Sequence, residues 1–253
     1  MRQAMNRNIA YQTEQLARYF SRNRVTWPQF YESERAIIDG LSLDARRSVL
    51  DIGCGCGGLG LALDERYGVV NYTGVEINPS AAEVARRMNP RAQILCGDIL
   101  QLSGVELAQR QFDVVFSLSC VDWNVQFADM LAAAWSHVVS GGYLVATFRL
   151  SDRGGCIDMT QSYQYINFDG AREGERAAYV VLNARDLMQT IIGFDPAEIN
   201  AYGYWGEPSK TAVTPYERLC FCAFSIRRRN QHGDALRLQL KLPAEIQDVM
   251  EVA

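Results

Sequence analysis

A run of glycines between residues 51 and 60 has the residue types and spacing best suited to binding a ligand. An apolar run ends in Asp51 and continues as Ile-Gly-Cys-Gly-Cys-Gly-Gly-Leu-Gly60. Glycines allow positive φ and leave bare backbone for a ligand, and the helix that follows points unpaired N–H groups at it. Gly53, Gly55 and Gly58 match G-x-G-x-x-G, so a dinucleotide is one interpretation. However, Asp51 would repel a pyrophosphate and attract an ammonium group.

Two more carboxylates follow, at the ends of the next two apolar runs. Tyr72-Thr-Gly-Val-Glu76 places Glu76 about 25 residues after Asp51, a separation that suits a carboxylate binding two ribose hydroxyls. Ile94-Leu-Cys-Gly-Asp98 ends in Asp98, which can accept a hydrogen bond from an adenine amino group. Ile77 and Ile99 come next in the chain and could enclose the adenine ring. Three carboxylates at three successive strand ends indicate a nucleoside site.

With these segments the chain resembles the class I S-adenosylmethionine-dependent methyltransferases. The matching stretches keep the family's order over roughly residues 46–150: Val49-Leu-Asp-Ile-Gly-Cys-Gly-Cys-Gly57, Gly74-Val-Glu-Ile77, Cys96-Gly-Asp-Ile99, Phe112-Asp-Val-Val-Phe-Ser-Leu-Ser119 and Ser140-Gly-Gly-Tyr-Leu-Val-Ala146. The resemblance implies S-adenosylmethionine as cofactor, with S-adenosylhomocysteine as product. It implies that Asp51 lies near the methionine moiety, Glu76 at the ribose and Asp98 at the adenine. The predicted cofactor-binding residues are Asp51, Gly53, Cys54, Gly55, Glu76, Ile77, Asp98, Ile99, Ser117, Leu118 and Trp123.

Asp122 is the predicted catalytic residue, since this family often places a residue facing cofactor and acceptor just past the fourth strand. A hydroxyl acceptor usually needs a base, whereas a neutral amine needs none. The other interpretation is that Asp122 caps the next helix. Trp123 would add an apolar or cation–π wall near the sulfonium. The two histidines, His137 and His232, are expected to be structural, because one lies late in a helix and the other beyond the last strand.

Short apolar runs alternate with helical patterns, as expected of an α/β fold with right-handed crossovers. With the resemblance, this predicts a doubly wound, Rossmann-like, seven-stranded and mostly parallel sheet with an antiparallel last strand. A short helix is expected near residues 103–109. We expect one methyltransferase domain in five parts: an N-terminal helical lid (1–45), the cofactor-binding core (46–150), a substrate insertion (151–182), the end of the core (183–229) and a C-terminal tail (230–253).

The N-terminal part shows helical spacing of apolar side chains over residues 8–21 and 28–40. These helices would cover the mouth of the cofactor site. The segment around their junction could bring Tyr19, Arg24 or Trp27 to the cofactor. Alternatively, Trp27 and Phe30 only seat the helices on the sheet.

The insertion at 151–182 is predicted to form a β-hairpin with a charged tip, because two apolar or alternating runs flank Asp169-Gly-Ala-Arg-Glu-Gly-Glu-Arg176. Ligands of open α/β sheets lie beyond the carboxyl ends of the strands, so the hairpin is placed to form the acceptor pocket. Its predicted substrate-binding residues are Asp158, Gln161, Tyr163 and Tyr165. The alternative is an edge extension or a dimer contact, so a homodimer is possible.

The composition indicates where in the cell the protein is found and which classes of partner it binds. With 253 residues, 48% hydrophobic and 21% charged, the chain can bury one large core. A net charge of −4 gives no footprint for nucleic acid. The cysteines lack zinc-site spacing, so no metal is expected. The polar N-terminus and the lack of a membrane-length apolar run predict a soluble, cytoplasmic protein that binds no membrane.

The predicted activity is methyl transfer from S-adenosylmethionine to an oxygen or nitrogen atom of a small molecule or sugar. After the fourth strand the chain has Ser117-Leu-Ser-Cys120, not the Asn/Asp-Pro-Pro-Tyr/Phe motif shared by enzymes that methylate amino groups of DNA and by some RNA and protein methyltransferases. Amino methylation of nucleic-acid bases is therefore disfavoured, and RNA and protein acceptors are less favoured. The acidic balance makes a small molecule or a glycan the leading acceptor. The alternatives are a non-catalytic cofactor-binding subunit and an NAD(P)-dependent oxidoreductase.

Overall fold

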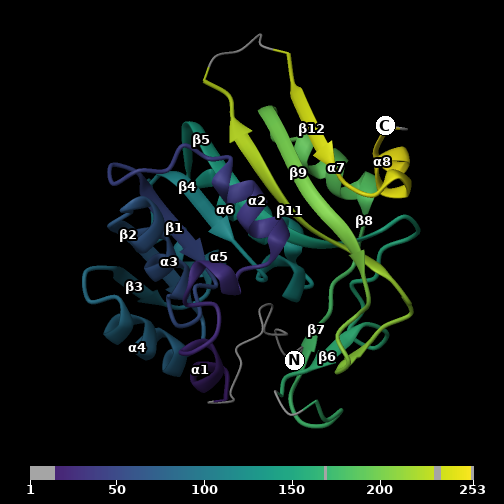
Figure 1. Ribbon diagram of the computed structural model, residues 1–253, viewed down its shortest axis with the longest axis horizontal. Coiled ribbons are helices and arrows are strands. Elements are labelled where there is room, and N and C mark those ends of the chain that lie inside the picture. The colour runs from purple at the N-terminus through teal and green to yellow at the C-terminus, as the bar shows by residue number, and fades with distance from the viewer. Residues whose placement is uncertain (1–14, 168–169, 231–234, 252–253) are drawn as a thin grey trace, which may run out of the picture.

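The computed structural model describes residues 15–167, 170–230 and 235–251. Figure 1 shows a twisted central sheet with helices on both faces and a small second sheet near one end of its strands. The elements in chain order are α1 (Gln15–Phe20), η1 (Trp27–Gln29), α2 (Glu32–Asp39), β1 (Ser48–Ile52), α3 (Gly58–Tyr67), β2 (Asn71–Glu76), α4 (Pro79–Met88), β3 (Gln93–Cys96), α5 (Ile99–Leu102), β4 (Phe112–Ser117), η2 (Val121–Trp123), α6 (Phe127–Ser136), β5 (Val138–Ser151), β6 (Tyr163–Tyr165), β7 (Arg176–Ala178), β8 (Leu182–Asn183), α7 (Ala184–Ile192), β9 (Pro196–Gly206), β10 (Ala212–Val213), β11 (Leu219–Arg228), β12 (Arg237–Lys241) and α8 (Ala244–Glu251).

The main sheet has the order β12-β9-β11-β5-β4-β1-β2-β3, with β8 beside β5. Strands β1 to β5 pair with one another in parallel, while β11 runs antiparallel to both β5 and β9. The predicted mostly parallel, doubly wound sheet with an antiparallel last core strand is confirmed. Within the described residues the sheet has nine strands and not seven. The additions are the short β8 and the edge strand β12, which lies in the segment expected to be a tail and is followed there by α8.

Alternating side chains of the central strands explain the three layers. Val49 and Val114 pack on one face with α2, α3 and α4, while Leu50 and Val115 pack on the other with α5, α6, α7 and α8. All four side chains are at most 2% exposed. Strands buried on both faces are typical of parallel sheets covered by crossover helices.

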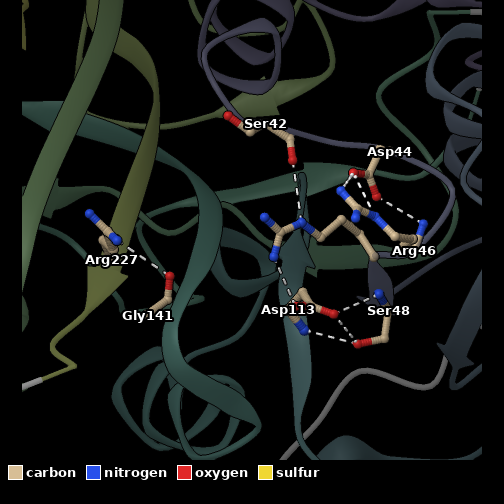
Figure 2. Close-up of polar contacts among 8 residues, drawn as sticks. Ser42, Asp44, Arg46, Ser48, Asp113, Gly141 and Arg227 are labelled. Atoms are coloured by element: carbon tan, nitrogen blue, oxygen red, sulfur yellow. Dashed lines mark hydrogen bonds and ion pairs between the residues drawn. The ribbon is translucent and has the colours of Figure 1, made fainter.

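The amino-terminal ends of β1 and β4 are joined by polar contacts. Asp113 accepts hydrogen bonds from the backbone N–H of Ser48 at 2.8 Å and from its hydroxyl at 2.7 Å, as Figure 2 shows. Arg47 adds an ion pair to Asp113 at 3.1 Å. These contacts fix the register of the two strands, whose other ends form the site described below.

Two helices differ from the predicted boundaries. The helix expected near 103–109 is not formed: these residues are turns, and the helix of this segment is α5, which ends before them and is capped by Asp98 through a hydrogen bond from the backbone N–H of Leu100. The helix expected over 28–40 is divided into η1 and α2, because Phe30 and Tyr31 are extended, with ψ of 149° and 153°. Of the pattern at 8–21, the structure describes only α1, and residues 8–14 lie outside the described residues.

Both histidines were expected to be structural, and no membrane-spanning segment was expected. His137 contacts the carbonyl of Arg110 through Nδ1 and the hydroxyl of Ser103 through Nε2, both at 2.9 Å, so neither ring nitrogen faces the site. His232 lies outside the described residues. No helix in the described part of the chain is long and apolar enough to span a membrane.

Candidate functional site

A large cavity lies at the carboxyl ends of the parallel strands. Its volume is about 1120 Å³, above the roughly 300–1,000 Å³ that usually holds one small molecule. We call the part lined by the ends of β1, β2 and β3 the cofactor half. The part lined by η2, the end of β5, and the segments at β6 and β9 is the acceptor half. The volume suits two ligands side by side.

The glycine turn between β1 and α3 forms the floor of the cofactor half. Gly53, Gly55 and Gly57 have φ of 74°, 55° and 77°, which disfavour any side chain. A Cβ on Gly53 would lie 2.5 Å from the sulfur of Cys120, and one on Gly58 would lie 2.0 Å from the backbone oxygen of Arg24. The turn therefore needs glycine both for its conformation and for the close approach of its neighbours.

Glu76, at the end of β2, connects this turn to the next one. Its two carboxylate oxygens accept hydrogen bonds from the backbone N–H groups of Gly55 and Asn78, both at 2.8 Å. The side chain is 7% exposed, and burial raises its pKa although these hydrogen bonds oppose the shift. The backbone thus fixes the carboxylate in the cavity wall, where its remaining lone pairs can accept from a ligand.

Asp51 lies at the end of β1 and is held by a tyrosine from the neighbouring strand. The Tyr72 hydroxyl donates to Asp51 Oδ2 at 2.5 Å. The missing side chain at Gly60 leaves room for the Tyr72 ring, since a Cβ there would lie 3.0 Å from the ring. Burial raises the pKa of Asp51 to about 7, and the Tyr72 hydrogen bond opposes that shift. A ligand ammonium group nearby would favour the ionised form.

The cavity brings together most of the predicted cofactor residues. Those that line it are Asp51, Gly53, Cys54, Gly55, Glu76, Ile77, Asp98, Ile99, Leu118 and Trp123. Ser117 is fully buried in β4 and is not part of the wall. The adenine-side residue Asp98 uses one oxygen to cap α5, at 2.9 Å from the Leu100 nitrogen.

The segment before α2 covers the glycine turn and is fixed by an ion pair. Arg24 donates to Glu34 Oε1 at 2.8 Å, and Glu34 is fully buried. The Arg24 guanidinium lies 4.8 Å from the Phe30 ring centroid, and its backbone has a φ of 60°. Tyr19 and Arg24 line the cavity, whereas Trp27 packs edge-to-face on Tyr67 outside it. Of the three side chains expected to reach the cofactor, two therefore border its half of the cavity.

Asp122 lies in the acceptor half, paired with a buried arginine. Its Oδ2 is 3.2 Å from Nη2 of Arg149, and both side chains are 6% exposed. Burial raises the pKa of Asp122, and the charge of Arg149 opposes this shift. The Asp122 side chain does not cap the next helix, because α6 begins after Gln126. Its second oxygen, Oδ1, is buried without a hydrogen-bond partner.

Two aromatic rings, perpendicular to each other, pack against the Arg149 guanidinium. Its guanidinium carbon lies 4.4 Å from the Trp123 ring centroid and 3.9 Å from that of Tyr179. Nη1 donates to the backbone oxygens of Asp122 at 2.6 Å and of Val180 at 3.4 Å. These contacts hold η2 against the end of β5 and fix the Asp122 carboxylate.

The insertion forms a hairpin of β6 and β7, extended by β10 into a small antiparallel sheet. Of its four predicted substrate residues, only Tyr165 lines the cavity. Asp158 accepts from the Thr160 nitrogen and from Gln161 in an exposed turn. Tyr163 packs edge-to-face on Tyr165, and the guanidinium carbon of Arg176 lies 4.9 Å from the Tyr163 ring centroid. The structure does not bring Asp158, Gln161 or Tyr163 to the cavity, because local contacts keep them in the turn and on the hairpin surface.

Several acceptor-half residues are absent from the sequence-based site. Arg149, Tyr179, Tyr204 and Asn167 all line the cavity. One signal was available: Arg149 is a charged residue in the apolar run Tyr143-Leu-Val-Ala-Thr-Phe-Arg-Leu150, and an arginine buried in a strand needs a partner. The other three come from separate segments that no local motif connects.

Residues 49–142 match a family model described as a methyltransferase domain. A trans-aconitate 2-methyltransferase from Deinococcus radiodurans is 29% identical over 97 residues, 38% of this chain and 35% of that protein. A malonyl-[acyl-carrier protein] O-methyltransferase from Marinomonas is 24% identical over 254 residues, 89% of this chain and 91% of that protein. The match thus spans about a third of the first relative and most of the second.

Among solved structures, the YcgJ protein of Bacillus subtilis has the same fold. The TM-score is 0.56 at 12% sequence identity, with 80% of this chain and 100% of that chain covered.

Proposed function

Because residues 49–142 carry the cofactor-binding domain of a class I S-adenosylmethionine-dependent methyltransferase, we propose that the chain transfers a methyl group to an oxygen or nitrogen atom of a small molecule or sugar. S-adenosylmethionine is the cofactor of this domain. When bound, it supplies a methyl group on a positively charged sulfur. The observation that carries the proposal is one cavity with three carboxylate-bearing strand ends in one half and Asp122 in the other.

The residues of the cofactor half fit this cofactor. The bare backbone at Gly53 and Gly55 admits the methionine part, and the buried Asp51 is suited to its ammonium group. Glu76, whose oxygens are already oriented by backbone N–H groups, is suited to the two ribose hydroxyls. The same charges disfavour NAD(P), since Asp51 would sit beside its pyrophosphate.

In the acceptor half, Asp122 is the proposed catalytic base. A base is most effective when its pKa lies near the working pH, and burial shifts the pKa of Asp122 upward from its ordinary value. Arg149 holds one carboxylate oxygen, so the free Oδ1 is the atom that takes the proton from the acceptor. The enclosing protein excludes water and orients the two reactants, which is a large part of catalysis for a bimolecular transfer.

Incubation with methyl-labelled S-adenosylmethionine and size-fractionated lysate tests this function. We expect label in low-molecular-weight compounds or glycans together with formation of S-adenosylhomocysteine. Label in protein or nucleic acid would contradict the proposed acceptor class. Binding of S-adenosylhomocysteine without transfer to any fraction would instead support a non-catalytic subunit.

A further inference from the structure

Three side chains on neighbouring strands form a row in the acceptor half. In the pairing of β5, β11 and β9, Phe221 lies directly opposite Arg149 on one side and Tyr204 on the other. Residues directly opposite each other in antiparallel strands point to the same face, with Cβ atoms about 5 Å apart. All three residues line the cavity, and we call this row the acceptor floor. Since neighbouring strands are about 4.8 Å apart, the acceptor floor is about 10 Å wide.

Phe221 is the part of the acceptor floor that the protein leaves uncovered. Every other residue from Leu219 to Ile226 in β11 is buried, whereas Phe221 is partly exposed. The missing side chain at Gly206 keeps one edge of the Phe221 ring open, because a Cβ there would lie 3.0 Å from two ring carbons. A partly exposed ring inside a cavity is apolar surface that a ligand can bury. This ring therefore favours an acceptor with a flat apolar face.

The contacts of Arg149 connect the acceptor floor to the proposed base. The Arg149 guanidinium lies 3.2 Å from the Asp122 carboxylate and packs against the rings of Trp123 and Tyr179. Trp123 and Phe221 both pack against the hydrophobic cluster that contains Tyr179. A flat ligand on Phe221 would therefore have the Asp122 carboxylate at the border of the surface on which it lies.

Hydroxyl groups at the acceptor floor already have partners in the protein. The Tyr204 hydroxyl is hydrogen-bonded to the Ser33 side chain. Thr147 Oγ1, two residues before Arg149 in β5, accepts a hydrogen bond from the backbone N–H of Ser119 at 2.6 Å. A sugar carries hydroxyl groups around its whole ring, and burying several of them without partners is costly. An aromatic ring with a single hydroxyl group fits this surface better.

The buried charges that act on Asp122 are neutralised in pairs. These charges belong to Arg149, Arg24 and Glu34. Arg149 pairs with Asp122 itself at 3.2 Å, and Arg24 pairs with Glu34 at 2.8 Å. Neither an anionic nor a cationic acceptor would find an unpaired opposite charge among these four groups. The site thus favours an uncharged acceptor.

The acidity of the acceptor points to the same class of compound. Phenolic hydroxyl groups ionise near pH 10, as in tyrosine, whereas aliphatic hydroxyl groups are much weaker acids. A carboxylate is a weak base, so it removes a proton from a phenol far more readily than from an alcohol. A phenol therefore matches a site whose proposed base is Asp122.

We propose that the acceptor is an uncharged aromatic hydroxy compound whose ring packs on Phe221 and whose hydroxyl group lies at Asp122. This inference rests on the proposed methyltransferase function and names its substrate class. The hydroxyl oxygen forms the new bond to the methyl carbon, and the electron pair of the carbon–sulfur bond stays on the sulfur. The hydroxyl proton passes to Asp122 and later returns to water. The products are an aryl methyl ether and S-adenosylhomocysteine.

Saturation-transfer NMR on the full chain with S-adenosylhomocysteine tests this proposal. The probes are 2-naphthol, methyl α-glucoside and malonate, which represent aromatic hydroxy compounds, sugars and small anions. We expect ring-proton signals from 2-naphthol alone. Phe221→Leu should bind 2-naphthol about two- to tenfold more weakly, the range for one lost aromatic contact. Phe127→Leu, at a partly exposed phenylalanine of α6 outside the cavity, is the matched control and should leave the affinity unchanged.

Signals from S-adenosylhomocysteine in each sample report that the variant is folded and binds the cofactor. Should Phe221→Leu lose them, Tyr204→Leu tests the other end of the acceptor floor with the same expected weakening. Signals only from the glucoside or malonate, or from none of the probes, would overturn the aromatic acceptor while leaving the methyltransferase function intact. Equal 2-naphthol affinity in the floor variant and the wild type would overturn the assigned contact. Absence of the S-adenosylhomocysteine signals in the wild type would overturn the proposed function itself.

Discussion

The cofactor half and the acceptor half of the cavity are built in different ways. The cofactor half consists of the ends of three neighbouring parallel strands, and backbone N–H groups orient Glu76. The acceptor half is assembled from distant segments, among them η2, the end of β5 and the segments at β6 and β9. Its central carboxylate, Asp122, is held by the Arg149 side chain instead. One half is thus a property of the fold, and the other depends on side chains from several parts of the chain.

The largest expected effect comes from the acceptor half. Asp122→Asn removes the proposed base and should lower kcat by about 10²- to 10⁴-fold, with little change in the affinity for S-adenosylhomocysteine. The acid limb of the rate–pH profile should also disappear, because Asp122 is active only when ionised. Steady-state kinetics with calorimetric binding checks both. Asp129→Asn, the same change at an exposed position of α6, is the control, and equal losses in both variants would contradict the assigned role.

Glu76→Gln tests the cofactor half. Removing the charge that is suited to the ribose should weaken S-adenosylhomocysteine binding by about ten- to a hundredfold, the range for hydrogen bonds to a charged group. Calorimetric titration measures the change, and Glu83→Gln on the exposed side of α4 is the control. An unchanged Kd would mean that the ribose lies elsewhere and that the two halves are wrongly divided.

Gly58→Ala tests whether the close backbone contact between the glycine turn and the covering segment contributes to stability. The new Cβ would lie 2.0 Å from the Arg24 oxygen and should reduce the free energy of unfolding by about 1–3 kcal/mol. Gly154→Ala is the matched control, because no atom lies within 4 Å of the Cβ it would gain. Urea denaturation compares the two variants. Equal stabilities would show that the covering segment is not packed on the turn.

The smallest expected effect is a pH dependence of cofactor affinity. The pKa of Asp51 is about 7 in the free protein. Below that pH the carboxyl group is increasingly protonated, so binding an ammonium group requires release of a proton. Affinity for S-adenosylhomocysteine should therefore rise between pH 5.5 and about 7 and level off above it, as expected for linked ionisation. Glu76, whose pKa burial also raises, should act in the same direction.

Tyr72→Phe sharpens that measurement. The Tyr72 hydroxyl donates to Asp51 and lowers its pKa, so its removal should move the midpoint of the affinity profile to higher pH. Calorimetry in buffers of different ionisation enthalpy counts the protons released. A profile that is flat in both proteins would contradict a role for Asp51 at the ammonium group.

The same contrast explains what the sequence predicts. Asp51, Glu76 and Asp98 end successive strands, so their meeting at one edge follows from the topology alone. The antiparallel β11 was also predictable through the family resemblance. Arg149, Asn167 and Tyr204 lie on three segments whose approach depends on how the insertion folds over the sheet, and no spacing encodes it. Asp158 and Gln161 were expected in the pocket because the insertion lies beyond the carboxyl ends of the strands, but a local turn keeps them outside it.

Titration calorimetry of the wild-type protein with S-adenosylhomocysteine and, separately, with NADH distinguishes a sulfonium nucleoside site from a dinucleotide site. We expect saturable binding of one S-adenosylhomocysteine per chain and no heat with NADH, because Asp51 favours an ammonium group and repels a pyrophosphate. Saturable NADH binding without S-adenosylhomocysteine binding would contradict it.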